Sequence, residues 1–108
     1  MGLLVNGEWK DQWYDTSKTG GIFVRSKSQF ENQIINDENA EFKPESNRYH
    51  LYISHACPWA HRALIFRKLK KLEEHISISV VHPLMLDKGW TFQEAEDVIP
   101  DSILGSKY

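Results

Sequence analysis

One short run of residues has the composition of a reactive thiol site: Cys57-Pro58-Trp59-Ala60. The residues before it predict a strand and those after it a helix, so Cys57 stands where a helix begins. The free N–H groups of a first helical turn and the helix dipole favour a thiolate over a thiol. His61 and Arg62, a turn further along, add positive charge. This arrangement predicts a nucleophilic cysteine.

Cys57 is the only cysteine of the chain, and this decides the class of thiol chemistry. The run resembles a Cys-x-x-Cys arrangement with Ala60 in place of the second cysteine. A dithiol enzyme resolves its own mixed disulfide, whereas a lone thiol needs an external thiol to do so. In a cytosol the first candidate for this external thiol is glutathione. The residues therefore predict a glutathione-dependent monothiol mechanism. The alternative is that Cys57 is only a small buried residue, as free cysteines often are.

Two other chemistries combine cysteine with histidine. Cys57 and His61 are four residues apart, on one face of the predicted helix, but two ligands do not make a zinc site. No second Cys/His pair has a fitting spacing, so no metal is predicted. A cysteine–histidine hydrolase needs a histidine beside the sulfur, and sequence alone does not place one there. The candidate bases are His50, His55, His61, His75 and His82.

A strand–helix–strand unit surrounds the thiol. Residues 49–54 are aromatic and β-branched and alternate in polarity, which predicts a strand. From Pro58 to about Glu74 apolar residues recur at three- and four-residue spacing, which predicts a helix with proline at its first position. Residues 76–81 alternate again and predict a second strand. Such a unit is expected to be right-handed with parallel strands. Basic residues in the second half of the helix predict a solvated face and not a nucleic-acid patch: Arg67, Lys68, Lys70 and Lys71.

The rest of the chain has little regular periodicity. Asn6-Gly7 indicates a hairpin turn, Phe30 and Ile34 indicate one turn of a short helix, and no clear strand follows Val81. Two strands and one helix bury little core. The predicted fold class is therefore α/β, a partial thioredoxin-like fold over residues 48–108 that follows an irregular N-terminal arm over residues 1–47 and is truncated before the rest of its sheet.

Composition excludes several classes of function. The 108 residues are 41% hydrophobic and 26% charged, as in a folded domain, and the net charge of −2 provides no basic surface for nucleic acid or an anionic membrane. No apolar run approaches the roughly 20 residues that cross a bilayer. The first residues also lack the features of a signal peptide. These observations predict a soluble, cytoplasmic protein.

Two runs resemble a known family. Residues 48–62 (RYHLYISHACPWAHR) and 89–92 (GWTF) are similar to the glutathionyl-hydroquinone reductases, which form the Xi class of glutathione transferases. The resemblance extends through residues 78–83 and into the N-terminal arm, so that it covers nearly the whole chain. In the family, further strands and a helical C-terminal domain follow, and these 108 residues contain neither.

The resemblance implies a reaction. Cys57 takes the place of the family's nucleophile, which attacks the glutathione sulfur of a glutathionyl-hydroquinone, releases the hydroquinone and is freed by a second glutathione. Trp90 falls where the family has a tryptophan that contacts glutathione. Without the resemblance, Trp90 would be interpreted as an aromatic residue of the core or one that covers the edge of the sheet. The family also implies glutathione as co-substrate, no metal, and homodimers. The alternative is a non-catalytic fragment that associates with another chain through an exposed sheet edge and the aromatic arm.

Overall fold

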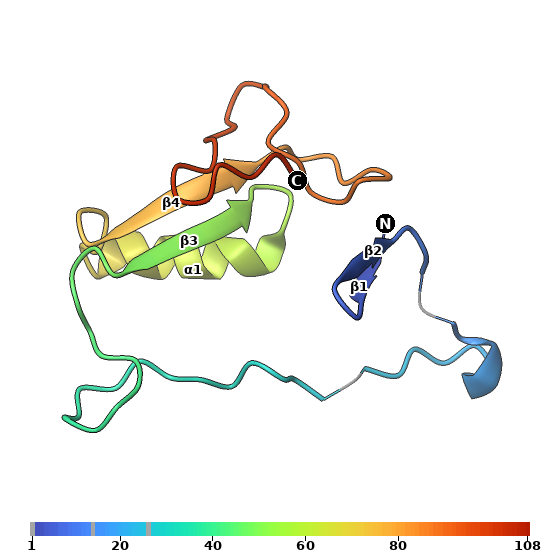
Figure 1. Cartoon of the computed structure of the whole chain (residues 1–108), viewed down its shortest axis with the longest axis horizontal. Coiled ribbons are helices and arrows are strands. Elements are labelled where there is room, and N and C mark those ends of the chain that lie inside the picture. Colours follow the sequence, from blue (N-terminus) through green and yellow to red (C-terminus); the bar gives the residue numbers. More distant parts are fainter. Residues whose placement is uncertain (1, 14, 26) are drawn as a thin grey trace.

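A computed structural model describes residues 2–13, 15–25 and 27–108. In chain order the elements are β1 (Leu3–Val5), β2 (Glu8–Lys10), the 3-10 helix η1 (Ser17–Thr19), β3 (Tyr49–Ser54), α1 (Pro58–Leu69) and β4 (Ile76–Val81). Figure 1 shows that β3, α1 and β4 form one unit, and that a long irregular arm connects it to the β1–β2 hairpin.

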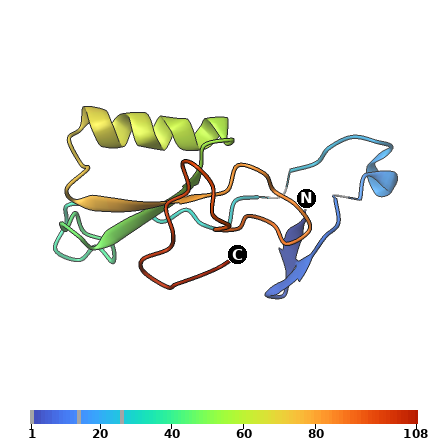
Figure 2. The ribbon, with the colours of Figure 1, turned by 90° about the horizontal axis from the view of Figure 1, so that it is seen from above.

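Strands β3 and β4 pair in parallel, with Tyr49 opposite Ile76 and Ser54 opposite Val81. Parallel strands need a crossover connection, and α1 provides it. The helix lies along one face of the pair, while the C-terminal segment runs over the other face (Figure 2). The predicted strand–helix–strand unit, and with it the α/β class, is confirmed.

Helix α1 begins at Pro58, as predicted, but ends at Leu69 and not near Glu74. Lys71 adopts a left-handed backbone with φ of 54°. The N–H groups of Lys71 and Leu72 then bond to the carbonyls of Lys68 and Arg67, at 3.0 and 2.8 Å. This is the hydrogen-bond pattern of a Schellman cap, which glycine usually forms. Because lysine takes the glycine position here, the sequence contains no glycine that would mark the end of the helix.

Arg67 differs from the solvated basic face predicted for it. Its side chain is half-buried, and its Nε donates to the Ile76 carbonyl at 2.6 Å while Nη2 donates to that of Glu73 at 2.9 Å. Arg67 therefore ties the end of α1 to the start of β4. Lys68, Lys70 and Lys71 are exposed.

The core is small and lies where the strands meet the C-terminal segment. Among the described residues, Ile53 and Val80 are the buried hydrophobic ones. Val80 also exchanges two backbone hydrogen bonds with Ile99, at 2.9 and 3.0 Å, so the tail adds one antiparallel bridge to the edge of β4. The buried Ser79 hydroxyl donates to the carbonyl of Pro100 at 3.0 Å. These contacts fix the C-terminal segment on the sheet.

The outer face of α1 stays uncovered in the described part of the chain. Ile65, Phe66 and Leu69 are 56%, 60% and 70% exposed, whereas Ala60 and Leu64 are half-buried. The three- and four-residue spacing of apolar residues therefore predicts the helix correctly, although part of this apolar set is exposed. None of the described helices is long and apolar enough to span a membrane.

The N-terminal hairpin matches its prediction, whereas the short helix in the arm does not. Leu3 pairs with Lys10 and Val5 with Glu8, and both turn residues, Asn6 and Gly7, have positive φ. Residues 30–34 are not helical, and Phe30 is 93% exposed. Two apolar residues at helical spacing do not make a helix without a surface to pack against.

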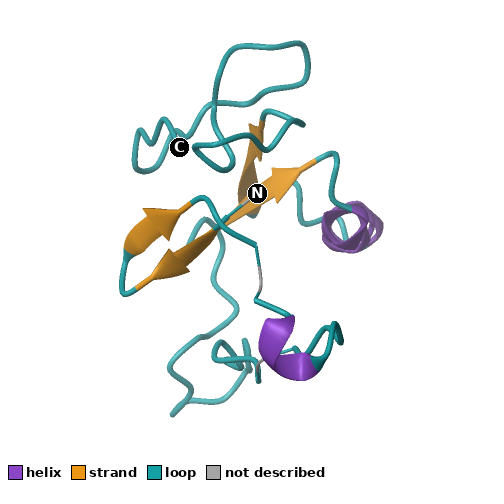
Figure 3. Cartoon of the chain, turned by 90° about the vertical axis from the view of Figure 1, so that its right-hand side faces the viewer, coloured by secondary structure: helices purple, strands orange, loops and turns teal. Residues whose placement is uncertain are grey.

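The boundary between the predicted arm (residues 1–47) and the predicted thioredoxin-like unit (residues 48–108) stays a prediction. Figure 3 shows how far the hairpin and η1 lie from the helix α1.

Candidate functional site

A tight turn brings Cys57 to the start of α1. The Ser54 carbonyl, at the end of β3, accepts a hydrogen bond from the Cys57 N–H at 3.1 Å. The Ser54 hydroxyl accepts one from the Ala56 N–H at 3.2 Å. Cys57 is the N-cap residue of the helix, with extended backbone (φ −95°, ψ 111°), and its side chain makes no capping hydrogen bond. The half-buried sulfur is therefore held at the helix start without being used to cap it.

Cys57 and Trp90, the two site residues predicted from the sequence, line one cavity of about 240 Å³. This thiol cavity joins the carboxyl ends of β3 and β4, the first turn of α1 and the loop that follows β4. Ligand sites of open α/β sheets typically lie at the carboxyl ends of the strands. Its lining consists of Tyr52, Ile53, Ser54, Cys57, Ala60, Val81 and Trp90.

Two histidines stand near the helix start without lining the thiol cavity. His61 Nε2 lies 3.0 Å from the carbonyl oxygen of His55, and the two rings are 6.3 Å apart. The link closes the turn that carries Cys57, since its ends lie on either side of that residue. A supporting role in the turn fits these contacts better than that of a catalytic base.

The other three histidines have partners away from the sulfur. Both ring nitrogens of His50 lie within 2.8 Å of serine hydroxyls on β4, His75 contacts the Ser46 hydroxyl, and His82 accepts the Leu84 N–H. None of the five histidines is among the described residues that line the thiol cavity. Among those described residues there is also no cluster of three or more His, Cys, Asp or Glu that suits a metal ion.

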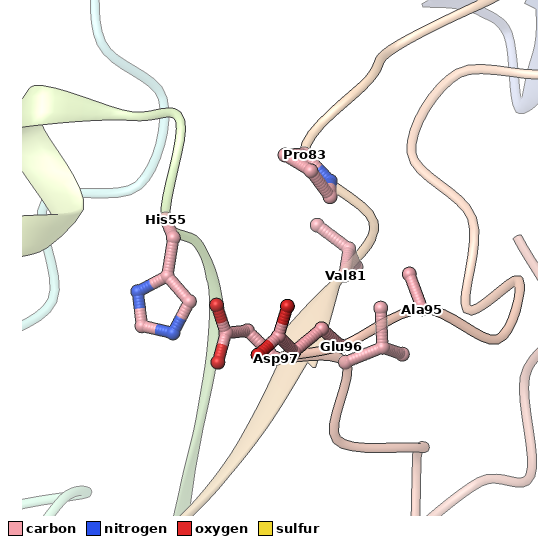
Figure 4. A pocket seen from close by; sticks show the side chains of 7 residues that line it. His55, Val81, Pro83, Ala95, Glu96 and Asp97 are labelled. Carbon is pink, nitrogen blue, oxygen red and sulfur yellow. The ribbon is translucent and has the colours of Figure 1, made fainter.

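A second cavity, of about 170 Å³, opens beside His55 (Figure 4). Val81 lines both cavities, so the end of β4 separates them. Figure 4 shows the His55 ring on one side and the carboxylates of Glu96 and Asp97 nearby, with Val81, Pro83 and Ala95 completing the walls. The thiol does not line this cavity.

Asp101 also shapes the site, although no motif in the sequence singles it out. Its carboxylate is 7% exposed and accepts hydrogen bonds from the Tyr52 hydroxyl at 2.8 Å and from three backbone N–H groups at 2.9 to 3.1 Å. Because Tyr52 lines the thiol cavity, Asp101 fixes one wall of the site to the C-terminal segment. The signal in the sequence is an aspartate four residues before Gly105, which has positive φ, a composition typical of turns.

Burial and hydrogen bonding act in opposite directions on the Asp101 carboxylate. Burial alone would raise the pKa of Asp101, but the hydrogen bonds from Leu104, Tyr52, Ile103 and Ser106 outweigh it and hold that pKa well below its usual range. For Tyr52, burial and then the hydrogen bond to Asp101 raise the pKa of the phenol. The pair therefore consists of a neutral phenol and an ionised carboxylate over a broad range of pH.

Comparison with known proteins identifies the class to which this fold and site correspond. Over 100% of its length the structure superimposes on a Xi-class glutathione transferase from Natrialba magadii, with a TM-score of 0.83 and 41% identity, and covers 31% of that chain. It also matches the glutathione-bound structure of YqjG from Escherichia coli K-12, with a TM-score of 0.60 and 51% identity, over 67% of this chain and 24% of that one. In fold and sequence this chain is therefore similar to part of the Xi-class glutathione transferases.

Two relatives in sequence have a named activity, that of a glutathionyl-hydroquinone reductase. The chain is 54% identical over 108 residues to the glutathionyl-hydroquinone reductase PcpF of Sphingobium chlorophenolicum, which is 100% of this chain and 33% of that protein. It is 55% identical over 101 residues to the glutathionyl-hydroquinone reductase YqjG of Escherichia coli, covering 88% of this chain and 31% of that protein. The predicted resemblance is confirmed, and the chain spans about a third of the length of these relatives. No protein-family model matches the chain.

Proposed function

We propose that this chain carries the thiol site of a glutathionyl-hydroquinone reductase, with Cys57 as its nucleophile and Trp90 as a contact for glutathione. The observation that supports this most is the thiol cavity, which is lined both by a cysteine at a helix start and by a tryptophan distant in sequence. Two relatives, YqjG and ECM4 of Saccharomyces cerevisiae, have been solved with glutathione. Glutathione is therefore the proposed co-substrate.

The proposed first step breaks a carbon–sulfur bond. The Cys57 sulfur, which lies at the first turn of α1, attacks the glutathione sulfur of the conjugate as the thiolate. A disulfide forms between Cys57 and glutathione, and the electron pair of the broken bond stays on the aromatic carbon, which takes up a proton. The released product is the hydroquinone.

The proposed second step restores the thiol. The thiolate of a free glutathione attacks the mixed disulfide at the glutathione sulfur, which forms glutathione disulfide and releases the Cys57 thiolate. In sum, two glutathione units are oxidised to the disulfide, and the aromatic carbon is reduced by two electrons. A chain with one cysteine needs this external thiol in every turnover.

Product analysis tests the proposed reaction. The purified chain is incubated with a glutathionyl-hydroquinone, with and without free glutathione, and the products are separated by chromatography. With glutathione, we expect hydroquinone and glutathione disulfide in equal amounts over many turnovers. Without it, we expect release to stop at one hydroquinone per chain. Absence of hydroquinone release in both reactions would contradict the proposal.

Replacing Ala60 by cysteine is expected to change how the mixed disulfide is resolved. The Ala60 N–H bonds to the Cys57 carbonyl at 3.1 Å, so residue 60 lies one turn along from the thiol. A second cysteine there would attack the mixed disulfide within the chain and release glutathione without a second glutathione molecule. Mass spectrometry should then find an intramolecular disulfide in place of the glutathione adduct. Ala60→Ser is the matched control and should keep the adduct.

Replacing Trp90 by alanine is expected to weaken glutathione binding more than it slows the chemistry. Trp90 is 36% exposed and lines the thiol cavity without being part of the helix start. We expect the KM for the conjugate to rise by about tenfold, with kcat lowered less. Steady-state kinetics with Trp59→Ala, which removes a 65% exposed tryptophan, provide the control. A fall in kcat alone would contradict a binding role for Trp90.

The proposal extends to the setting of the site. We infer that the chain is divided into an arm over residues 1–47 and a thioredoxin-like unit over residues 48–108. We also infer a cytoplasmic location, where glutathione keeps Cys57 reduced. The family resemblance further implies homodimers. Location by fluorescence microscopy and the mass in solution by sedimentation test the last two.

A further inference from the structure

The N-terminal hairpin contacts the loop that carries Trp90. The indole Nε1 of Trp9, on β2, donates a hydrogen bond to the carbonyl of Asp87 at 2.6 Å. In Figure 1 the hairpin lies beside the loop that follows β4, although some 80 residues separate the two in sequence. A segment that the sequence assigned to an irregular arm therefore reaches the edge of the thiol site.

The ring of Trp9 lies directly against the backbone of this loop. Gly89 is buried and has φ of +77°, and a Cβ at this position would stand 2.9 Å from Cη2 and 3.1 Å from Cζ2 of Trp9. On Gly2, a Cβ would come within 2.6 Å of the same Cζ2. The indole is thus held between two glycines, and only residues without a side chain fit there.

Trp90 depends on this loop for its place. It lines the thiol cavity with Cys57, and it also lines a cavity of about 410 Å³ together with Trp9, Lys88 and Tyr108. A side chain that borders two cavities is not held by close packing alone. The backbone before it is held by a hydrogen bond from the Gly89 N–H to the Leu86 carbonyl at 3.0 Å and by Trp9.

We propose that Trp9 is a positioning residue, which holds the loop over residues 86–90 so that Trp90 forms a wall of the thiol cavity. The hydrogen bond fixes the loop at Asp87, and the stacked ring fixes it at Gly89, the residue next to Trp90. The functional consequence rests on the proposed function, because it assumes that Trp90 contacts glutathione. Loss of Trp9 then weakens the capture of glutathione compounds while the thiol chemistry of Cys57 stays intact.

The experiment separates the position of Trp90 from its role. The chain is labelled with 5-fluorotryptophan, and the ¹⁹F resonances of its four tryptophans are assigned from single Trp→Phe variants. Glutathionylation of Cys57 by glutathione disulfide, which releases one glutathione, is followed by intact mass at increasing concentration. Hydroxyethyl disulfide, which has no glutathione part, measures the thiol chemistry alone.

In Trp9→Ala we expect the Trp90 resonance to move, the half-saturating concentration of glutathione disulfide to rise about fivefold or more, and the rate with hydroxyethyl disulfide to stay within about twofold. Trp9→Phe keeps a ring against Gly89 but loses the donor, and a smaller change is expected. Phe30→Ala, which removes a 93% exposed side chain of the same arm, is the control and should change neither reading.

Each other outcome has a definite meaning. An unmoved Trp90 resonance in Trp9→Ala and Trp9→Phe would overturn the positioning role. Movement of the Trp59 resonance on α1 as well would also overturn it, because the effect would then be a general loss of structure. If only the Trp90 resonance moves and the half-saturating concentration stays the same, the positioning role stands, and the glutathione contact assigned to Trp90 under the proposed function fails.

Discussion

Replacing Cys57 by serine is expected to lower the release of hydroquinone from a glutathionyl-hydroquinone by roughly a thousandfold or more. A serine hydroxyl at the same helix start stays protonated at neutral pH, and its oxygen does not form the disulfide that the first step requires. The initial rate of hydroquinone release, measured by chromatography at saturating glutathione, provides the comparison with the wild-type chain.

A relocated cysteine is the matched control for this loss. In the double variant Cys57→Ser with Ser28→Cys the chain keeps one thiol, now on an exposed part of the arm. We expect this thiol to react with general alkylating reagents but to release no hydroquinone, since no helix start or cavity surrounds it. Wild-type rates in Cys57→Ser, or recovery of the rate in the double variant, would show that the position of Cys57 is not what matters.

Replacing Asp101 by asparagine is expected to cause the largest loss of stability among single polar substitutions, with Tm lowered by on the order of 10 °C at neutral pH. The carboxylate accepts three hydrogen bonds at Oδ1 and one, from the Ser106 N–H, at Oδ2. Asparagine replaces one of these oxygens with an NH₂ group, which then faces at least one N–H donor, and it removes the negative charge. Circular dichroism melts of wild type and variant measure the difference.

The difference between wild type and Asp101→Asn should depend on pH. Because the pKa of Asp101 is lowered in the folded chain, its contribution is present above the unfolded value of about 3.9 and is lost as the pH falls from there towards the folded value. We therefore expect the gap in Tm to be constant from pH 7 to 5 and to narrow below about pH 4. Asp97→Asn, an exposed carboxylate in the same tail, is the control. A gap that does not change with pH would contradict the role assigned to the charge.

The parts of the fold that local sequence determines were predicted correctly. Alternation predicts strands over residues 49–54 and 76–81, and both strands have these bounds in the structure. The proline at residue 58 predicts the start of the helix, and only the end of the helix differs from the prediction. The thiol site follows from these elements, because the residue before Pro58 has to stand at the first turn of α1. The hairpin follows from Asn6-Gly7 for the same local reason.

The errors concern features that depend on contacts distant in sequence or on an unusual residue. Lys71 ends α1 in a conformation that glycine usually adopts. The hydrogen bond from Tyr52 to Asp101, the bridge between Val80 and Ile99, and the contact of Trp9 with Asp87 join segments about 20 to 80 residues apart. No periodicity in a single sequence reports such pairs. Trp90 was connected with Cys57 through the family resemblance and not through spacing.

The central claim is that Cys57 takes glutathione from an aromatic conjugate. The most direct measurement is the intact mass of the chain after exposure to a glutathionyl-hydroquinone without free glutathione, followed by peptide mapping. We expect a gain of one glutathione, located on Cys57, which added glutathione removes and which Cys57→Ser does not acquire. An unchanged mass, or an adduct that retains the hydroquinone ring, would contradict it.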